Sequence, residues 1–193
     1  MESKIKSYAN GYFTLDSCEI KDKNFKPKEN ELYRYIELAD IESNGFIRTP
    51  KSYLGRDLPT RARRLVRNGD VIISSIEGSL ESCALITKEF DNCLVSTGFY
   101  VLRSHRMNAE SLLMLFRSSL FQEYLKKFPS GTILTAISKE ELQKILIPQL
   151  DSQTQEQIAK VVANNFDLIQ KARAQLMANE ESLGRQIFSL KEF

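Results

Sequence analysis

Residues 130–163 constrain the fold of this chain most, because two helix starts follow each other there within a short distance. Ser138 stands three residues before Glu141, a spacing typical of the capping box at a helix N-terminus. Ser152 and Gln155 repeat this spacing. We therefore predict two helices in this region, a short one after Ser138 and a second one that runs to the end of the chain.

A buried strand is predicted between these two helices. The apolar run at residues 145–147 favours a strand, and Pro148 ends it because proline has no N–H to donate to a ladder. No proline follows, so the second helix can continue over about residues 153–190. The sequence thus predicts a globular body over residues 1–150 and one long helix over residues 151–193.

The body mixes predicted strands with predicted helices. β-prone runs predict strands at residues 33–39, 71–73, 84–86 and 94–102, with a bulge or a close backbone approach at Gly98 in the last one. Helices are predicted at residues 61–66, with Thr60 as cap and Gly69 as a left-handed stop, and from an Asn108 cap to about Lys127. This pattern is typical of a mixed α/β (α+β) body.

Composition excludes several classes of protein. The chain is 42% hydrophobic and 27% charged, as in soluble globular proteins, and it has no apolar run long enough for a membrane span or a signal peptide. Cys18, Cys83 and Cys93 form no C-x-x-C pair, and His105 is the one histidine, so we expect reduced thiols in a cytoplasmic protein without a metal. Nucleotide-binding, metalloprotease and adenine-methylation motifs are absent. We expect a binding protein without a cofactor.

Basic residues concentrate between Phe46 and Arg67. This segment has one acidic residue, Asp57, and a net charge of +6, while the whole chain carries +2. Its seven basic residues are Arg48, Lys51, Arg56, Arg61, Arg63, Arg64 and Arg67. A local basic patch on an otherwise slightly acidic body favours a polyanion such as DNA, with contacts mainly to phosphate. Within such a patch, Arg63 or Arg64 is the residue we expect to pair with core carboxylates or carbonyls instead of phosphate. The alternative is a solvated loop whose arginines bind nothing.

Two glycine-containing loops carry polar side chains suited to sequence recognition. We predict base contacts from six residues, namely Glu77, Ser79, Glu81, Ser82, Ser130 and Thr132. Such side chains on short loops at sheet ends can reach the edges of bases in the major groove. The alternative is that Gly78 and Gly131 simply allow turns there.

The C-terminal helix carries a row of mostly apolar residues at coiled-coil spacing. The row consists of Ile158, Val162, Asn165, Ile169, Ala172, Leu176, Asn179, Leu183, Gln186 and Leu190. A helix this long spans about 57 Å, more than its own body can cover, so we predict an antiparallel homodimer through this row. Asn165 and Asn179 would fix its register. The alternative is that the first half of the helix folds back onto the body.

Three segments together resemble the specificity subunit of type I restriction-modification systems. They are YIELADIESNGFI at residues 35–47, LPTRARRLVRNGDVIIS at residues 58–74, and SGTILTAISKEELQKILIPQLDSQTQEQIA at residues 130–159. Their order and spacing match a target recognition domain followed by the family's conserved spacer helix. Residues 149–151 depart from the pattern, since the family usually has a second proline there. The chain also has one recognition domain and one helix, where the family usually has two of each.

The resemblance implies a non-catalytic subunit that recognises double-stranded DNA. In that family each recognition domain reads one half of a split target, while the helices space the halves and dock the methyltransferase subunits of a complex that also contains restriction subunits. A half-sized member would pair with a second copy through its helix. Two other interpretations stay open, namely a coiled-coil adaptor whose body binds protein, and the specificity fragment of a fused restriction-methylation enzyme.

Overall fold

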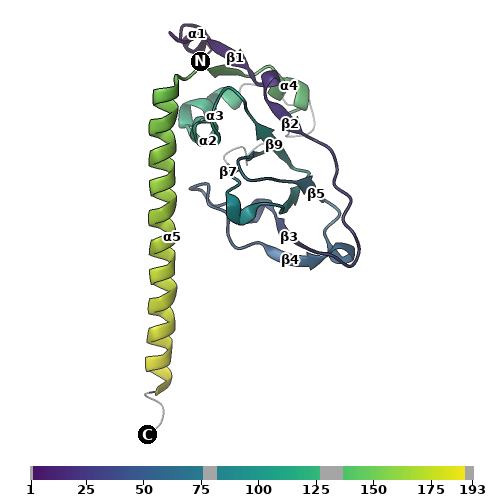
Figure 1. Ribbon diagram of the computed structural model, residues 1–193, viewed down its shortest axis with the longest axis vertical. Coiled ribbons are helices and arrows are strands. Elements are labelled where there is room, and N and C mark those ends of the chain that lie inside the picture. The colour runs from purple at the N-terminus through teal and green to yellow at the C-terminus, as the bar shows by residue number, and fades with distance from the viewer. Residues whose placement is uncertain (1, 76–81, 127–136, 190–193) are drawn as a thin grey trace.

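The computed structural model describes residues 2–75, 82–126 and 137–189. In these residues, two four-stranded sheets and short helices form a body, and one long helix, α5 (Ser152–Ser189), runs along its side and continues past it (Figure 1). Short 3₁₀ turns connect several strands, at η1 (Leu15–Ser17), η2 (Leu38–Asp40), η3 (Gly55–Asp57) and η4 (Lys88–Phe90).

The central sheet of the body is antiparallel throughout. Its spatial order is β2 (Glu19–Lys21), β9 (Phe99–Arg103), β6 (Val71–Ser74) and β7 (Cys83–Leu85). Val71 and Ile73 face a core formed with the helices, while Ile72 faces a second core shared with the other sheet. Because both faces are covered, Val71, Ile72 and Ile73 are all buried, and β6 lies where the sequence predicted a strand.

The second sheet contains one parallel pair. Its spatial order is β4 (Lys51–Leu54), β3 (Leu32–Ile36), β8 (Leu94–Ser96) and β5 (Ala62–Leu65), with β3 and β8 parallel. β8 and β9 were predicted as one strand with a bulge at Gly98, and this prediction is wrong. The chain turns at Thr97 and Gly98 and crosses from one sheet to the other, because β8 pairs in the second sheet and β9 in the first.

The predicted helix at residues 61–66 is also wrong, since these residues form β5. Arg64 and Leu65 pair with Val95 and Leu94 of β8, and the register shifts at a bulge between Ala62 and Arg64. Pairing with β8 satisfies the backbone groups that a helix would satisfy internally, so tertiary context overrides the local turn signals. Gly69 does adopt the predicted left-handed conformation, with φ +84°.

The predicted helix from Asn108 is split in two, α2 (Ala109–Arg117) and α3 (Ser119–Leu125). Asn108 caps α2 as predicted, accepting a bond from Ser111 N at 2.9 Å. Ser118 breaks the helix and caps α3, where its hydroxyl accepts from Phe121 N at 3.3 Å. The break lets Phe116 and Phe121 meet in the core at 5.4 Å between ring centroids, so packing holds both short helices.

The joint between body and long helix closes against the start of the chain. β10 (Leu146–Pro148), the predicted buried strand, pairs with β1 (Tyr12–Thr14), and α1 (Glu2–Lys6) packs next to them. α4 (Lys139–Gln143) precedes β10 and has the predicted capping box. There, Ser138 Oγ accepts from Glu141 N, and Glu141 Oε2 accepts from Ser138 N.

The second capping box is wrong, because Asp151 caps α5 in place of Ser152. The Asp151 carboxylate accepts from Thr154 N at 2.7 Å and from the Thr154 hydroxyl at 3.0 Å. These bonds lower the pKa of Asp151 below its ordinary value. A carboxylate is favoured at this position because the helix N-terminus carries partial positive charge. Gln155 is thereby free to bond to the body.

Candidate nucleic-acid interface

The described residues that flank the two predicted base-reading loops lie close together at the end of β6. Ser75 N donates to Gly98 O at 2.9 Å, and Ile137 N donates to Ser75 O at 3.0 Å. Ser74 N donates to Ser82 O at 2.9 Å on the other side. Glu77, Ser79, Glu81, Ser130 and Thr132 lie outside the described residues. Ser82 is half-buried beside this point, and its base contact stays a prediction.

The basic residues of β5 begin at the same end of the body. Arg61 is exposed, and its carbonyl accepts from Thr97 N at 2.8 Å, next to the turn that holds Ser75. Arg63 Nη1 donates to the carbonyl of Ala62 at 3.0 Å, which is the carbonyl pairing considered for it. From Arg61 to Arg67 the segment extends about 20 Å, the rise of about six base pairs.

Arg64, in the middle of β5, has a guanidinium with unused donors. Its Nε and Nη1 atoms are buried and have no hydrogen-bond partner in the described structure. Its charge acts on the ionisable groups of Asp22 and Tyr100, lowering the pKa of Asp22 as a minor cause beside the hydrogen bond from Lys139. Unpaired buried charge is costly. A phosphate that reached this side chain would satisfy these donors.

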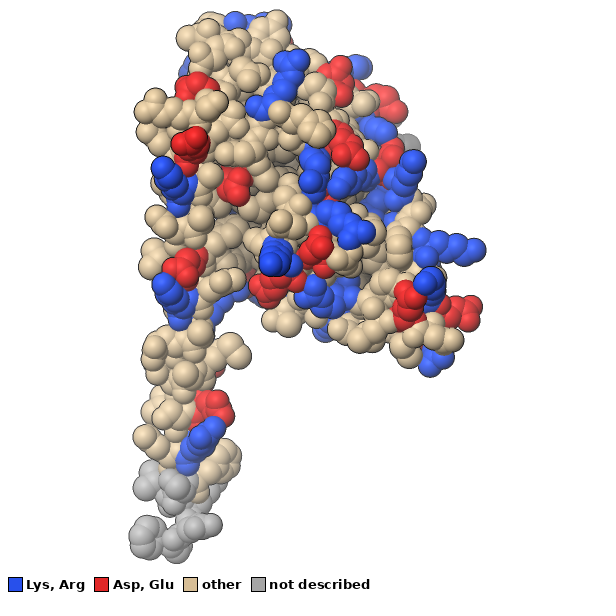
Figure 2. All heavy atoms as spheres, viewed as in Figure 1, with Lys and Arg blue, Asp and Glu red and all other residues tan. Residues whose placement is uncertain are grey.

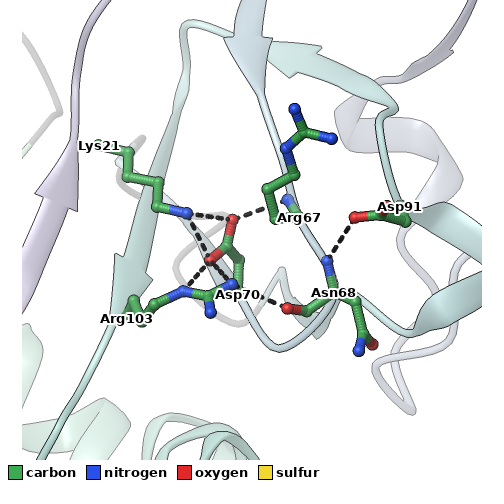
Figure 3. A network of polar contacts seen from close by, with 6 residues as sticks. All are labelled: Lys21, Arg67, Asn68, Asp70, Asp91 and Arg103. Atoms are coloured by element: carbon green, nitrogen blue, oxygen red, sulfur yellow. Dashed lines mark hydrogen bonds and ion pairs between the residues drawn. The ribbon is translucent and has the colours of Figure 1, made fainter.

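The far end of the central sheet holds two cations bonded to one buried carboxylate, with Arg67 beside them (Figure 3). Asp70 is fully buried and accepts from Lys21 Nζ at 2.9 Å and from Arg103 Nε at 2.8 Å. It also accepts from the backbone N of Arg67 at 2.8 Å, and the Arg67 guanidinium points away from it toward solvent. Asp70 thus holds Lys21 and Arg103 in place beside Arg67, with positive charge in excess.

Sequence reasoning missed Lys21 and Arg103. They lie 49 and 33 residues from Asp70 in the chain, and no local spacing signals that they meet. Figure 2 shows basic side chains gathered over the part of the body where β2, β5 and β9 lie in Figure 1, with acidic side chains among them. Basic residues from three separate strands therefore contribute to this face.

The seven basic residues of residues 46–67 do not form the single patch that was predicted. Lys51 of β4 and Arg56 after it lie at the edge of the second sheet opposite to β5, with β3 and β8 between them. Arg48 lies elsewhere, where its Nε atom is 3.3 Å from Glu42 Oε1. The segment crosses the sheet, so its charges are divided among three places.

The apolar row of α5 is likewise divided. Val162 is 4% exposed, and Ile158 and Ile169 are half-buried, so the body covers the first half of the row, as the alternative held. Leu176 and Leu183 are 58% and 57% exposed, and Asn165, Ala172, Asn179 and Gln186 are also exposed. Leu190 lies outside the described residues. Val161, Leu168 and Ile187 extend the exposed row at helical spacing. We name Val161, Leu168, Leu176, Leu183 and Ile187 the outer row.

Comparison with known proteins identifies the family. A model described as "Type I restriction modification DNA specificity domain" matches residues 10–177. The chain belongs to this family. No helix in the described ranges is long and apolar enough to cross a membrane.

Relatives of this specificity domain are consistently longer than it is. The HindI specificity subunit of Haemophilus influenzae is 25% identical over 159 residues, which cover 80% of this chain and 34% of that subunit. The solved HsdS subunit of Thermoanaerobacter tengcongensis is 28% identical with a TM-score of 0.70, over 89% of this chain and 46% of the other. The S subunit of M. genitalium shares the fold at 14% identity and a TM-score of 0.62, over 96% and 47%. The chain thus spans about a third to a half of these subunits.

Proposed function

We propose that this specificity domain is a non-catalytic reader of one half of a split target in double-stranded DNA. The observation that carries the proposal is the basic face that runs from Arg61, next to the end of β6 where the predicted reading loops attach, along β5 to the Asp70 cluster at the other end of β6. The basic residues position the duplex through phosphate, and the loop residues recognise bases.

The basic residues outside this face contribute less to DNA binding in this proposal. Arg64 lies in β5 and Arg61 and Arg67 flank this strand (together the β5 residues), whereas Lys51 and Arg56 lie at the opposite sheet edge. Arg48 is engaged by Glu42 near the long helix. We assign the phosphate contacts first to the β5 residues together with Lys21 and Arg103. This revises the wider set expected from the sequence.

We infer that the chain acts as an antiparallel homodimer through α5. The outer row exposes large apolar side chains, and burying each one contributes about 1.5–3 kcal/mol. An antiparallel pair places the two bodies at opposite ends of a rod of about 57 Å, whereas a parallel pair brings two basic faces together. The paired helices would also dock the methyltransferase subunits, with the restriction subunits joining the same complex.

DNA binding at increasing salt concentration tests the proposed function. We would measure the affinity of the purified protein for duplex pools by fluorescence anisotropy, with Arg61→Gln and Arg67→Gln beside Lys51→Gln as control. Each β5 change should flatten the salt dependence by about one unit and weaken all sequences alike, whereas the control should change little. Affinity that is unaffected by both β5 changes would reject this face as the interface.

A coiled-coil adaptor is the second candidate, and the outer row favours it. An adaptor would form the α5 pair but show no salt-dependent binding to duplex DNA. Methylation mapping in cells that express the protein with methyltransferase subunits then tests sequence recognition directly. A methylated split sequence that appears only with this chain supports the reader over the adaptor.

A further inference from the structure

Specific polar and aromatic contacts attach the long helix to the body at two places, on either side of the strip where α2 packs against it. The first is its opening turn, where the Gln155 side chain accepts from Asn108 N at 2.7 Å and donates to Leu150 O at 3.0 Å. Asn108 Nδ2 donates in return to the carbonyl of Gln155 at 3.0 Å. This joint and the packing of α2 around the buried Val162 hold the first turns of the helix. They leave the direction of the later turns to the second attachment.

The second attachment is the loop at residues 41–47, which we name the latch. Phe46 of the latch packs against Phe166 of α5 with ring centroids 4.6 Å apart. Arg173 of α5 lies over the other side of this contact, with Cζ 4.8 Å from the Phe46 ring centroid, and forms an ion pair with Glu42. Phe46 is 8% exposed, so the helix and the latch bury it between them.

Hydrogen bonds within the latch and contacts with Arg117 of the body fix the conformation of the latch. Ile41 and Ile47 form a bridge, and Glu42 N donates to Phe46 O at 2.9 Å. Gly45 has φ +82°, and a Cβ atom there would lie 2.8 Å from Arg117 Nη1. Arg117 Nη2 in turn donates to Ser43 O at 2.7 Å. A loop this constrained presents Glu42 and Phe46 to the helix in one arrangement.

Beyond Arg173 the helix leaves the body. A cavity of about 260 Å³ opens beside the latch, lined by Phe46, Phe166 and Met177 among others, and Leu176, Leu183 and Ile187 are exposed beyond it. The latch is therefore the last contact that sets the direction of α5 relative to the body.

We propose that Glu42, Phe46 and Arg173 are positioning residues that set the number of base pairs between the two half-sites. This inference rests on the proposed function, since spacing has meaning only for a split target. The joint and the latch are 18 residues apart on α5, or about 27 Å. A swing of about 10° over that length displaces the far end by about 5 Å, more than the 3.4 Å rise of one base pair. Releasing the latch should relax spacing without altering the sequence recognised.

A distance measurement tests, without DNA or partners, whether the latch fixes the direction of α5 relative to the body. Spin labels at Asp57→Cys and Arg185→Cys report the distance from the body to the end of α5, because both side chains are exposed and the three native cysteines are buried. Excess unlabelled protein suppresses distances between copies. Phe46→Ala and Glu42→Gln should widen the distribution by about 5 Å or more. Lys171→Ala, which breaks only an exposed pair on the same helix, is the control.

Methylation mapping tests the functional part. The wild-type protein should accept one spacer length, and Phe46→Ala and Arg173→Ala should accept neighbouring lengths with unchanged half-site sequences. Arg173→Lys and Phe46→Leu should restore the single spacing, because they keep the charge and the apolar contact. A structural defect alone would lower methylation at every site without widening the spacing.

The distance measurement and the methylation mapping together distinguish failure of this inference from failure of the proposed function. Narrow distance distributions in folded latch variants, or a changed half-site sequence at unchanged spacing, would overturn the positioning role. Absence of methylation with the wild-type protein would instead reject the proposed function, and the distance measurement would still decide whether the latch fixes α5. If Phe46→Ala does not fold, Glu42→Gln removes the ion pairs with Arg173 and Arg48, leaves the Phe46–Phe166 contact in place and keeps the test.

Discussion

Arg64 is the residue at which stability and DNA binding should separate most clearly. Replacing Arg64 with Met keeps an apolar stem and removes a charge whose Nε and Nη1 atoms are buried without partners. The melting temperature should therefore stay equal or rise, while DNA affinity falls and the salt dependence flattens by about one unit. Calorimetry and anisotropy measure the two effects, with Arg56→Met at the opposite sheet edge as control. Loss of stability together with unchanged DNA binding would show that Arg64 serves only the fold.

Replacing Asp70, in contrast to replacing Arg64, should destabilise the fold. Asp70→Asn leaves Lys21 and Arg103 close together without the carboxylate that pairs them. Because both partners remain partly exposed and can regain water, the expected loss is about 2–3 kcal/mol in the free energy of unfolding. Urea denaturation measures this loss. Asp57→Asn, in an exposed pair at 3.8 Å, should change stability by less than about 0.5 kcal/mol.

At the scale of elements, the cap of α5 predicts a pH effect. The pKa of Asp151 is lowered by its bonds to Thr154, so its stabilisation is fully present above the ordinary value of 3.8 and is lost as pH falls through the lowered pKa. Asp151→Asn keeps an acceptor but not the charge. The melting temperature of the wild type should exceed that of the variant at neutral pH, and the two should converge in acid. A constant difference at all pH values would contradict the charged cap.

Elements with short-range signals could be predicted from the sequence, and those that depend on distant pairing could not. The Ser138 capping box, the Asn108 cap and the buried strand β6 follow from spacing and from apolar runs. β5 was missed because its identity depends on β8, about thirty residues away, while Pro59 and Gly69 suggested a capped turn of helix. The candidate site shows the same difference. The basic residues of β5 could be predicted because they are close together in the sequence. Lys21 and Arg103 could not be predicted, because only sheet pairing brings them to Asp70.

At the scale of the whole molecule, the exposed outer row predicts that the protein forms a dimer. Leu176→Glu with Leu183→Glu should convert a dimer into a monomer in sedimentation, because two charges would be buried in the pair. Ala163→Glu with Ala178→Glu places the same charges on exposed positions away from the outer row and should leave the dimer intact. A wild-type protein that stays monomeric alone and with DNA would contradict homodimer formation. Dimer recovery only with methyltransferase subunits would show that a different helix covers the row.

The pairing of β1 with β10 has a consequence for how such genes can change. Tyr12 lies opposite Pro148, so residues 12–148 leave and return at one point of the folded molecule, just before α5 begins (Figure 1). Chain ends that lie together let a unit be moved without threading or stretching its neighbours. Recombination at these two strands would exchange the whole body while α5 stays the same, and under the proposed function this body is the part that reads DNA. A new DNA preference could then be acquired in one genetic event.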